Sequence, residues 1–196
     1  MEVPQAGGRD VAPLGTGVQG HACLPRRARR RQGLCPWGST GMTRTGFTDA
    51  LSWMIATVCG AGQAPVAPGT WASLLAAGVW YWGPQERWIH WTACAITIMA
   101  GWWAAGRCAR HLGQADPSCV VVDEVAGMWL ALIGLPRTFP VLIAGFLLFR
   151  LLDISKCPPI RQLERVQGGA GIMLDDVAAG LISRAALIFC LRWLAG

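Results

Sequence analysis

Charged residues are scarce in this sequence. Only 14% of its 196 residues are Asp, Glu, Lys or Arg, whereas 53% are hydrophobic. A soluble domain is usually about a quarter charged, so this composition argues against one and predicts a membrane protein. The eleven tryptophans agree with that prediction, because Trp favours the interface between lipid and water.

Several motifs that would define other chemistries are missing. None of the eight cysteines forms a C-x-x-C pair, and the three histidines are scattered. We therefore expect buried free thiols and no zinc site. The glycine-rich segment 168–171 lacks the G-K-[ST] of a nucleotide-binding P-loop. No apolar segment follows the arginines at 26–31, so we do not expect a signal peptide there.

The net charge of +6 belongs almost entirely to an N-terminal arm. Residues 1–46 hold seven arginines against two acidic residues, which gives +5, so the rest of the chain is nearly neutral. The arm is rich in Gly, Pro and Arg without helical or strand periodicity, which predicts disorder. It offers only Trp37 for stacking on bases, so we expect no nucleic-acid partner. The predicted domains are the arm, 1–46, and a membrane domain, 47–196, with Met42 as an alternative start of translation.

Long uncharged segments predict the helices. The clearest membrane span is 88–106, which has 19 uncharged residues between two arginines. Segment 50–85 is uncharged but broken by Gly and Pro, so it predicts a short helix near 49–59 and another over 71–83, with Thr70 as its N-cap. The loop 65–70 is either a plain connector or a phosphate site. Further helices are predicted at 120–135, 138–152 and 176–194. The expected fold class is an all-α, polytopic membrane bundle of about six helices.

Basic residues orient this bundle. The connection after residue 149 carries Arg150, Lys156, Arg161 and Arg165, and loops rich in Lys and Arg stay in the cytoplasm. Following the predicted helices from that connection places the start of 120–135, the end of 138–152 and the start of 176–194 on the cytoplasmic side.

Carboxylates gather at those same three helix ends. The chain has 11 acidic residues, and five of them lie there: Asp123, Glu124, Asp153, Asp175 and Asp176. A carboxylate inside an apolar segment is expensive and marks a functional site. Beside Lys156 and the glycines at 168–171, these residues predict divalent-metal and phosphate chemistry.

Each of these residues also has a simpler interpretation. Asp175 and Asp176 could cap a helix, and Asp123 and Glu124 could do the same for theirs. Asp153 and Lys156, three residues apart, could form a local ion pair. Arg161 is either a phosphate ligand or an ordinary cytoplasmic charge. Lys156 is the only lysine among 17 basic residues, which hints at a need for a compact ammonium group.

Four motifs resemble the phosphatidylglycerophosphatase A family. They are A-P-V-A-P-G-T-W at 64–71, D-E-V-A-G-M-W at 123–129, F-R-L-L-D at 149–153 with Lys156, and G-G-A-G-I-M-L-D-D at 168–176. They occur in the family's order and spacing, and the resemblance covers 48–195. One departure is Lys156-Cys157-Pro158-Pro159, where the family has Lys-Pro-x-Pro.

The resemblance implies a lipid phosphatase of the bacterial inner membrane that makes phosphatidylglycerol from phosphatidylglycerophosphate. It would be a multi-pass, Mg²⁺-dependent enzyme whose active site faces the cytoplasm and whose partner is its membrane phospholipid substrate. The implied metal ligands are Asp123, Asp153, Asp175 and Asp176. Glu124 would be a ligand or base, and the phosphate would be held by Thr70, Lys156 and Arg161. The nucleophile is either water or an aspartate.

Two other classes compete with this prediction. A CDP-alcohol phosphotransferase needs two more aspartates at four-residue spacing, which this chain lacks. A non-enzymatic transporter or assembly factor could use the same acidic residues as an ion site. Phosphate release from a lipid would separate the enzyme from that alternative.

Overall fold

The computed structural model describes residues 46–84, 86–155 and 168–195, all of them within the unit 32–196. These residues form six α-helices, one short 3-10 helix and no strand, so the all-α prediction is confirmed for them. The helices are α1 (Phe47–Ala56), η3 (Ala61–Gln63), α2 (Pro68–Trp82), α3 (Arg87–Leu112), α4 (Val122–Leu132), α5 (Phe139–Ser155) and α7 (Gly169–Ala195). The predicted arm, Lys156 and Arg161 lie outside the described residues.

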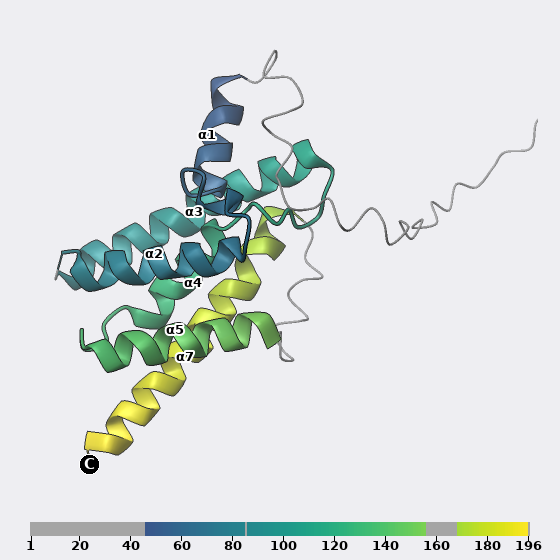
Figure 1. The fold of residues 1–196 in the computed structure, drawn as a ribbon. Helices are drawn as coiled ribbons and strands as arrows, with labels where there is room; N and C mark the ends of the chain where they lie inside the picture. The colour runs from purple at the N-terminus through teal and green to yellow at the C-terminus, as the bar shows by residue number, and fades with distance from the viewer. Residues whose placement is uncertain (1–45, 85, 156–167, 196) are drawn as a thin grey trace, which may run out of the picture. The chain divides into compact units, whose positions relative to one another are not determined.

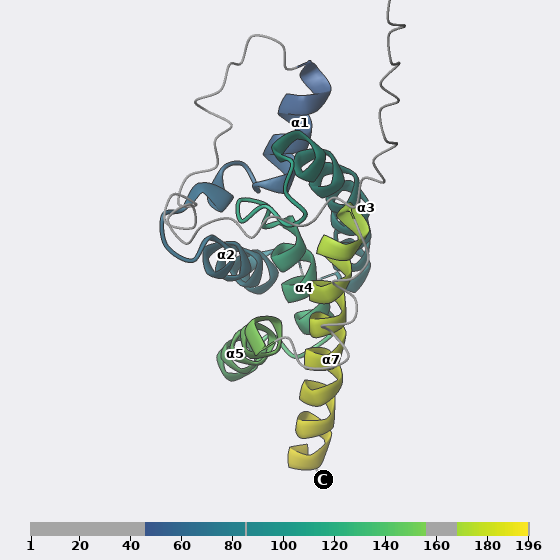
Figure 2. The same cartoon turned by 90° about the vertical axis from the view of Figure 1, so that its right-hand side faces the viewer.

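Helix α4 lies at the centre of this bundle. It packs against α2, α3, α5 and α7 (Figures 1 and 2), and it is buried along almost its whole length. The largest side chains of the core around it are Trp80, Met128 and Phe149, each at most 1% exposed. Burial on all sides explains why α4 is apolar throughout apart from its first turn.

The helix order gives the bundle two distinct ends. The turn between α2 and α3 lies on the same side as the turn between α4 and α5, at the left of Figure 1. We call this the turn end. The start of α4, the last turn of α5 and the start of α7 lie at the other end, which we call the carboxylate end.

Glycines let α4 and α7 cross in backbone contact. A Cβ placed on Gly180 would lie 2.3 Å from the carbonyl oxygen of Gly127, and one on Gly127 would lie 2.7 Å from the carbonyl oxygen of Asp176. A side chain at either position would force the helices apart. The close approach places Asp176 directly beside α4.

The start of α2 differs from the prediction. The helix begins at Pro68, not at residue 71, and its N-cap is Ala67 with φ 47°. Proline is favoured at the first position of a helix because its φ is already helical and it has no N–H to leave unbonded. Thr70 therefore lies inside the first turn, where its N–H donates to Ala67 O at 3.0 Å. The prediction of Thr70 as N-cap was wrong.

The start of α7 also differs from the prediction. This helix begins at Gly169, seven residues before the predicted start, and takes in two of the glycines of segment 168–171. A Cβ on Gly169 would lie 2.2 Å from Trp102 O and 2.6 Å from Gly106 N. The contact with α3 explains why a segment of low helix propensity is helical here, since tertiary packing overrides propensity.

The outer surface of the bundle carries large apolar side chains. Exposed examples come from every long helix, including Trp71, Leu75, Trp102, Leu147 and Phe189. Among the described residues, one helix is both long and apolar enough to cross a membrane, Gly169–Leu194 in α7. Helix α3 has 26 residues, whereas α2, α4 and α5 have 15, 11 and 17. A full span needs about 20 residues.

The cysteines only partly follow the prediction of buried free thiols. Cys94 and Cys108 are free and buried, while Cys59 and Cys190 are free but exposed. Cys119 is buried but disulfide-bonded. The prediction was therefore wrong for the exposed Cys59 and Cys190 and for the bonded Cys119.

Candidate active site

Carboxyl groups from three helices converge at the carboxylate end. Asp123 and Glu124 occupy the first turn of α4, and Asp176 lies in α7. One carboxylate oxygen from each of these three residues lies within 4.8 Å of the others. Asp153, near the end of α5, approaches Asp176 within hydrogen-bonding reach. The structure thus brings together four of the five predicted acidic residues.

These carboxyl groups are buried. Asp123 is 8% exposed and Asp176 is 3% exposed. Asp123 Oδ1, Glu124 Oε2 and Asp176 Oδ2 are shielded from solvent and have no hydrogen-bond partner among the described residues. Burial of an ionised carboxylate costs several kcal/mol even after the protein relaxes, and like charges side by side add to that cost. A cation is the natural counterpart of such a group.

Helix capping does not explain these residues. Asp175 and Asp176 follow a helix that has already run from Gly169, so neither lies at its N-terminus. The capping alternative for this pair was wrong. Asp123 and Glu124 do lie in the first turn of α4, where the helix dipole favours negative charge. That position still leaves one oxygen of each without a partner.

The start of α2 is packed against the same carboxylates. A Cβ on Gly69 would lie 2.0 Å from Glu124 Oε1 and 3.3 Å from Arg150 Nη1. Only a glycine lets both side chains reach the backbone at this point. Thr70, the next residue, is half-buried, and its N–H is already bonded within the turn. Gly69 of the motif at 64–71 therefore lies against the Glu124 carboxyl group, and the Thr70 hydroxyl is the next polar group along the chain.

Arg150 is a candidate site residue that the sequence reasoning missed. Its Nη1 donates to Asp153 Oδ2 at 2.7 Å, with both side chains about 15% exposed. Its Nε is buried without a partner among the described residues. The sequence reasoning used Arg150 only as a cytoplasmic charge, although it precedes Asp153 by three residues and so shares its helix face. Among the described residues, Arg150 is the cation that pairs with the Asp153 carboxyl group.

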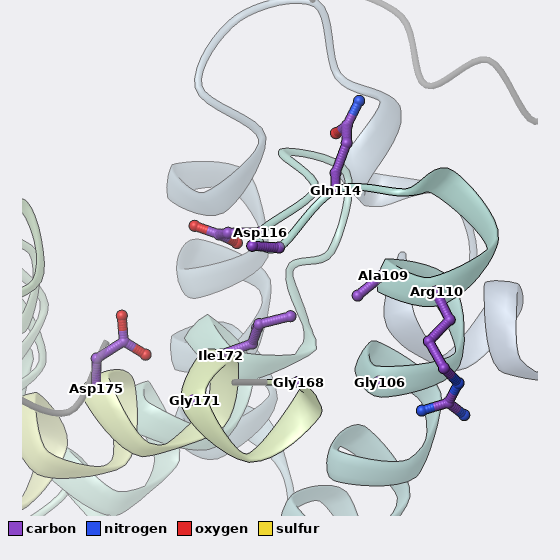
Figure 3. A pocket seen from close by; sticks show the side chains of 10 residues that line it. Gly106, Ala109, Arg110, Gln114, Asp116, Gly168, Gly171, Ile172 and Asp175 are labelled. Atoms are coloured by element: carbon purple, nitrogen blue, oxygen red, sulfur yellow. The ribbon is translucent and has the colours of Figure 1, made fainter. Parts of the chain in front are cut away.

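Asp175 points elsewhere. It lines a neighbouring cavity of about 530 Å³ between the end of α3 and the start of α7, together with Arg110, Gln114 and Asp116. Figure 3 shows Asp116 and Asp175 on one side of this cavity, with Arg110 extending away from them. Consecutive helix residues point about 100° apart, so Asp175 and Asp176 face different surroundings. Lys156 and Arg161, which were predicted to contact the phosphate, lie outside the described residues.

Comparison with known proteins identifies the family. Residues 54–191 match the family model described as phosphatidylglycerophosphatase A. The chain belongs to this family. Phosphatidylglycerophosphatase A of Escherichia coli is 38% identical over 69% of this chain and 81% of its own length. The protein of the same name from Haemophilus influenzae is 31% identical over 71% of this chain and 88% of its own length.

A third relative has a different name. A protein from Bacteroides thetaiotaomicron named "Putative phosphatidylinositol-3-phosphatase" is 40% identical over 79% of this chain and all of its own length. No solved structure matches the chain. The predicted family and the predicted enzyme class, a phosphatidylglycerophosphatase acting on a phosphoric monoester, are confirmed. The alternative of a non-enzymatic transporter is set aside.

Proposed function

We propose that this enzyme removes the terminal phosphate of phosphatidylglycerophosphate at the cytoplasmic face of the membrane, with Mg²⁺ held by Asp123, Glu124 and Asp176. The observation that supports the proposal most is the group of carboxylate oxygens from these three residues, which lie within 4.8 Å of one another. Each of the three residues keeps a buried oxygen that has no hydrogen-bond partner among the described residues.

The donor set fits Mg²⁺. This ion takes oxygen ligands at about 2.0–2.1 Å and keeps several waters beside one or two carboxylates and a substrate phosphate. A group drawn from two helices, with Asp153 behind Asp176, offers such oxygens. Asp175 remains a predicted ligand that lines the adjacent cavity. When bound, Mg²⁺ would neutralise phosphate charge and lower the pKa of a bound water.

Arg150 is proposed to bind the phosphate. A guanidinium offers a fork of N–H donors that matches two phosphate oxygens at once. Asp153 fixes the orientation of this fork through the 2.7 Å bond to Nη1, while the buried Nε keeps an unused donor. The charge that builds on the phosphoryl oxygens during transfer is stabilised best by donors that are already in place. Lys156, Arg161 and the Thr70 hydroxyl remain proposed contributors.

The hydrolysis needs no reagent other than water. Water attacks phosphorus, and a carboxylate of the group, Glu124 or Asp123, accepts its proton. The bond between phosphorus and the glycerol oxygen breaks, and that oxygen takes up a proton. The products are phosphatidylglycerol and inorganic phosphate. An aspartate as nucleophile is the alternative route, in which a phosphorylated aspartate is hydrolysed in a second step.

A multi-pass position in the bacterial inner membrane is supported by the surface. Large apolar side chains are exposed on α2, α3, α5 and α7, and extensive apolar surface marks contact with a membrane or a protein partner. Arg107 and Arg110 end α3 near the carboxylate end, and Arg150 lies there too. By the positive-inside rule, these residues support a site that faces the cytoplasm.

The proposal is tested by comparing two lipid substrates. The E. coli and Bacteroides relatives carry names that refer to different phosphate esters, so phosphatidylglycerophosphate and phosphatidylinositol 3-phosphate are the informative pair. Purified protein in mixed micelles should release phosphate from phosphatidylglycerophosphate with at least a tenfold higher kcat/KM. Equal rates, or a preference for the inositol lipid, would overturn the proposed substrate while leaving the enzyme class intact.

A further inference from the structure

A second polar cavity lies at the turn end of the bundle. It has a volume of about 350 Å³, and its lining includes Trp80, Arg87, His90, Gly134 and Arg137. These residues come from the end of α2, the start of α3 and the turn between α4 and α5. The length of α4, 11 residues or about 16 Å, separates this turn from Asp123 and Glu124. The cavity is therefore not part of the candidate active site.

Arg137 is held in this cavity by neutral groups. Its Nη1 donates to Gly83 O at 2.9 Å, its Nη2 contacts Pro84 O and His90 Nε2, and its guanidinium lies 5.5 Å from the centre of the Trp80 ring. None of these partners carries a negative charge. The side chain is thus fixed in position, while no described partner offsets its positive charge.

Among the described residues, no carboxylate lines the cavity. The ion pairs found among the described residues join Asp49 to Arg107 and His111, and Asp153 to Arg150, so neither Arg87 nor Arg137 takes part in one. Glu86 is exposed just before α3 and is not among the residues that line the cavity. A concave site with two arginines and no acidic lining attracts anions.

Arg184 adds positive charge behind the cavity wall. It lies in the apolar part of α7, its guanidinium is 5.2 Å from the centre of the Trp91 ring, and its Nη1 is buried without a partner among the described residues. A Cβ on Gly134 would lie 3.2 Å from Arg184 Nη2, and Gly134 has φ 77°. Glycine at this turn both adopts the left-handed backbone and lets the guanidinium approach the cavity.

Tryptophans place the cavity at the depth of lipid head groups. Trp82 is 81% exposed and Trp88 is 68% exposed, and they flank the turn whose residues contact Arg137. Trp91, one turn further along α3, is also exposed. Exposed tryptophans collect where the hydrocarbon meets the head groups, which is the level of phospholipid phosphates.

We infer that the cavity binds the phosphate of an anionic phospholipid from the leaflet at the turn end. Arg87 and Arg137 would donate to the phosphate oxygens, and Trp82 and Trp88 would pack beside the upper acyl chains. The inference rests on the proposed membrane embedding, but it does not depend on the proposed substrate. The inference also gives Arg87 and Arg137 a role. They lie at the turn end, where the positive-inside rule predicts few arginines.

Native mass spectrometry of protein released from nanodiscs tests the inference. Nanodiscs of equal parts phosphatidylserine and phosphatidylcholine are suitable, since neither lipid is the proposed substrate or product. The variants are Arg87→Gln and Arg137→Gln. Arg192→Gln is the control, because Arg192 is an exposed arginine in the last turn of α7 and does not line the cavity. Phosphate release from phosphatidylglycerophosphate is measured on the same preparations.

The wild-type protein should retain phosphatidylserine over phosphatidylcholine. The loss of one charged donor should lower this preference about tenfold in Arg87→Gln, with phosphatase activity within about twofold of wild type, while Arg192→Gln keeps the preference. Arg87 is exposed and makes no hydrogen bond or ion pair in the described structure, so this variant stays informative even if Arg137→Gln weakens folding.

Three results would overturn the inference. They are equal retention of the two lipids by the wild type, an equal loss in Arg192→Gln and Arg87→Gln, or displacement of phosphatidylserine by millimolar inorganic phosphate. The third result would assign the site to free phosphate and not to lipid. A protein that retains phosphatidylserine as expected but releases no phosphate would contradict the proposed function alone.

Discussion

Gly69 of α2 and Glu124 of α4 meet so closely that no side chain fits between them. A Cβ on Gly69 would lie 2.0 Å from Glu124 Oε1 and 2.8 Å from its Cδ. The contact joins a helix start to a buried carboxylate that belongs to the group with Asp123 and Asp176. The position of Glu124 therefore requires that residue 69 has no Cβ.

Gly69→Ala should therefore impair catalysis. The added Cβ must push Glu124 or α2 aside, and displacement of a catalytic group by about 1 Å can cost about a hundredfold in rate. Gly78→Ala in the same helix is the matched control, because a Cβ there meets only the Trp82 ring, at 3.3 Å. We expect kcat of Gly69→Ala to fall at least tenfold and that of Gly78→Ala to stay within about twofold. Equal kcat in the two variants would remove Glu124 from the site.

The carboxylates should act as one unit. Asp123→Asn, Asp153→Asn and Asp176→Asn should each abolish Mg²⁺-dependent phosphate release, and the double variant Asp123→Asn/Asp176→Asn should be hardly worse than either single one. Asn keeps the shape and much of the hydrogen bonding, so insertion and protein levels should stay normal. Steady-state kinetics on the four variants gives the answer. Losses that multiply in the double variant would instead indicate separate structural roles.

Thermal unfolding gives a readout that does not depend on turnover. In the wild type, Mg²⁺ should raise Tm, because a cation that binds only the folded state stabilises it. In Asp176→Asn, Tm without metal should be equal or higher, since one buried charge is gone, and the rise with Mg²⁺ should disappear. The same Mg²⁺-induced rise in wild type and variant would exclude Asp176 as a ligand.

Arg150→Lys should lower kcat strongly although the charge is kept. An ammonium cannot bond Asp153 and grip two phosphate oxygens in one plane as a guanidinium does. Loss of one preorganised donor to a transition-state oxyanion costs about a hundredfold. Arg192→Lys, at an exposed position in the last turn of α7, should leave kcat unchanged. Wild-type kcat in Arg150→Lys would mean that Arg150 does not act in catalysis and only helps to set the orientation in the membrane.

The ion pair that fastens α1 to α3 should depend on pH. Arg107 Nε donates to Asp49 Oδ1 at 2.6 Å, and this hydrogen bond, assisted by His111, holds the pKa of Asp49 below its usual value of 3.8. A lowered folded-state pKa contributes stability above the unfolded pKa, and that stability is lost as the pH falls through the folded value.

Hydrogen exchange of the α1 amides, corrected for intrinsic rates, measures this effect. At pH 7, Asp49→Asn should exchange faster than wild type in α1, and the difference should shrink below about pH 4 as Asp49 of the wild type takes up a proton. The amides of α5 serve as the control, because that helix does not contact Asp49. A difference that grows at low pH would contradict this account of the ion pair.

Sequence patterns indicated the acidic group because its residues break an otherwise apolar chain. Asp123, Asp153 and Asp176 stand out in segments where a carboxylate is expensive to bury. The same patterns could not separate Asp175 from Asp176, because the helix was expected to begin at the pair. The structure shows that α7 starts earlier, at Gly169, where the backbone contacts Trp102 and Gly106. Asp175 and Asp176 therefore lie within the helix and face different ways.

The roles proposed for Gly69 and Arg150 could be inferred only from three-dimensional contacts. Gly69 looks like an ordinary turn glycine until Glu124, 55 residues later, is seen against it. In the sequence, Arg150 is one of several basic residues that predict the cytoplasmic side. Its bond to Asp153 is seen only in the structure. A motif shows which residue types occur together, whereas the direction of a side chain depends on where each helix begins and which neighbour it packs against.

The central claim is a Mg²⁺-dependent phosphatase centred on Asp123, Glu124 and Asp176. Its most direct test is phosphate release from phosphatidylglycerophosphate by purified protein, first with a chelator and then after Mg²⁺ is restored. Wild-type activity should vanish with the chelator and return with Mg²⁺, while Asp123→Asn should stay inactive at every Mg²⁺ concentration that saturates the wild type. Full wild-type activity in the chelator, or full recovery of Asp123→Asn with Mg²⁺, would contradict the account.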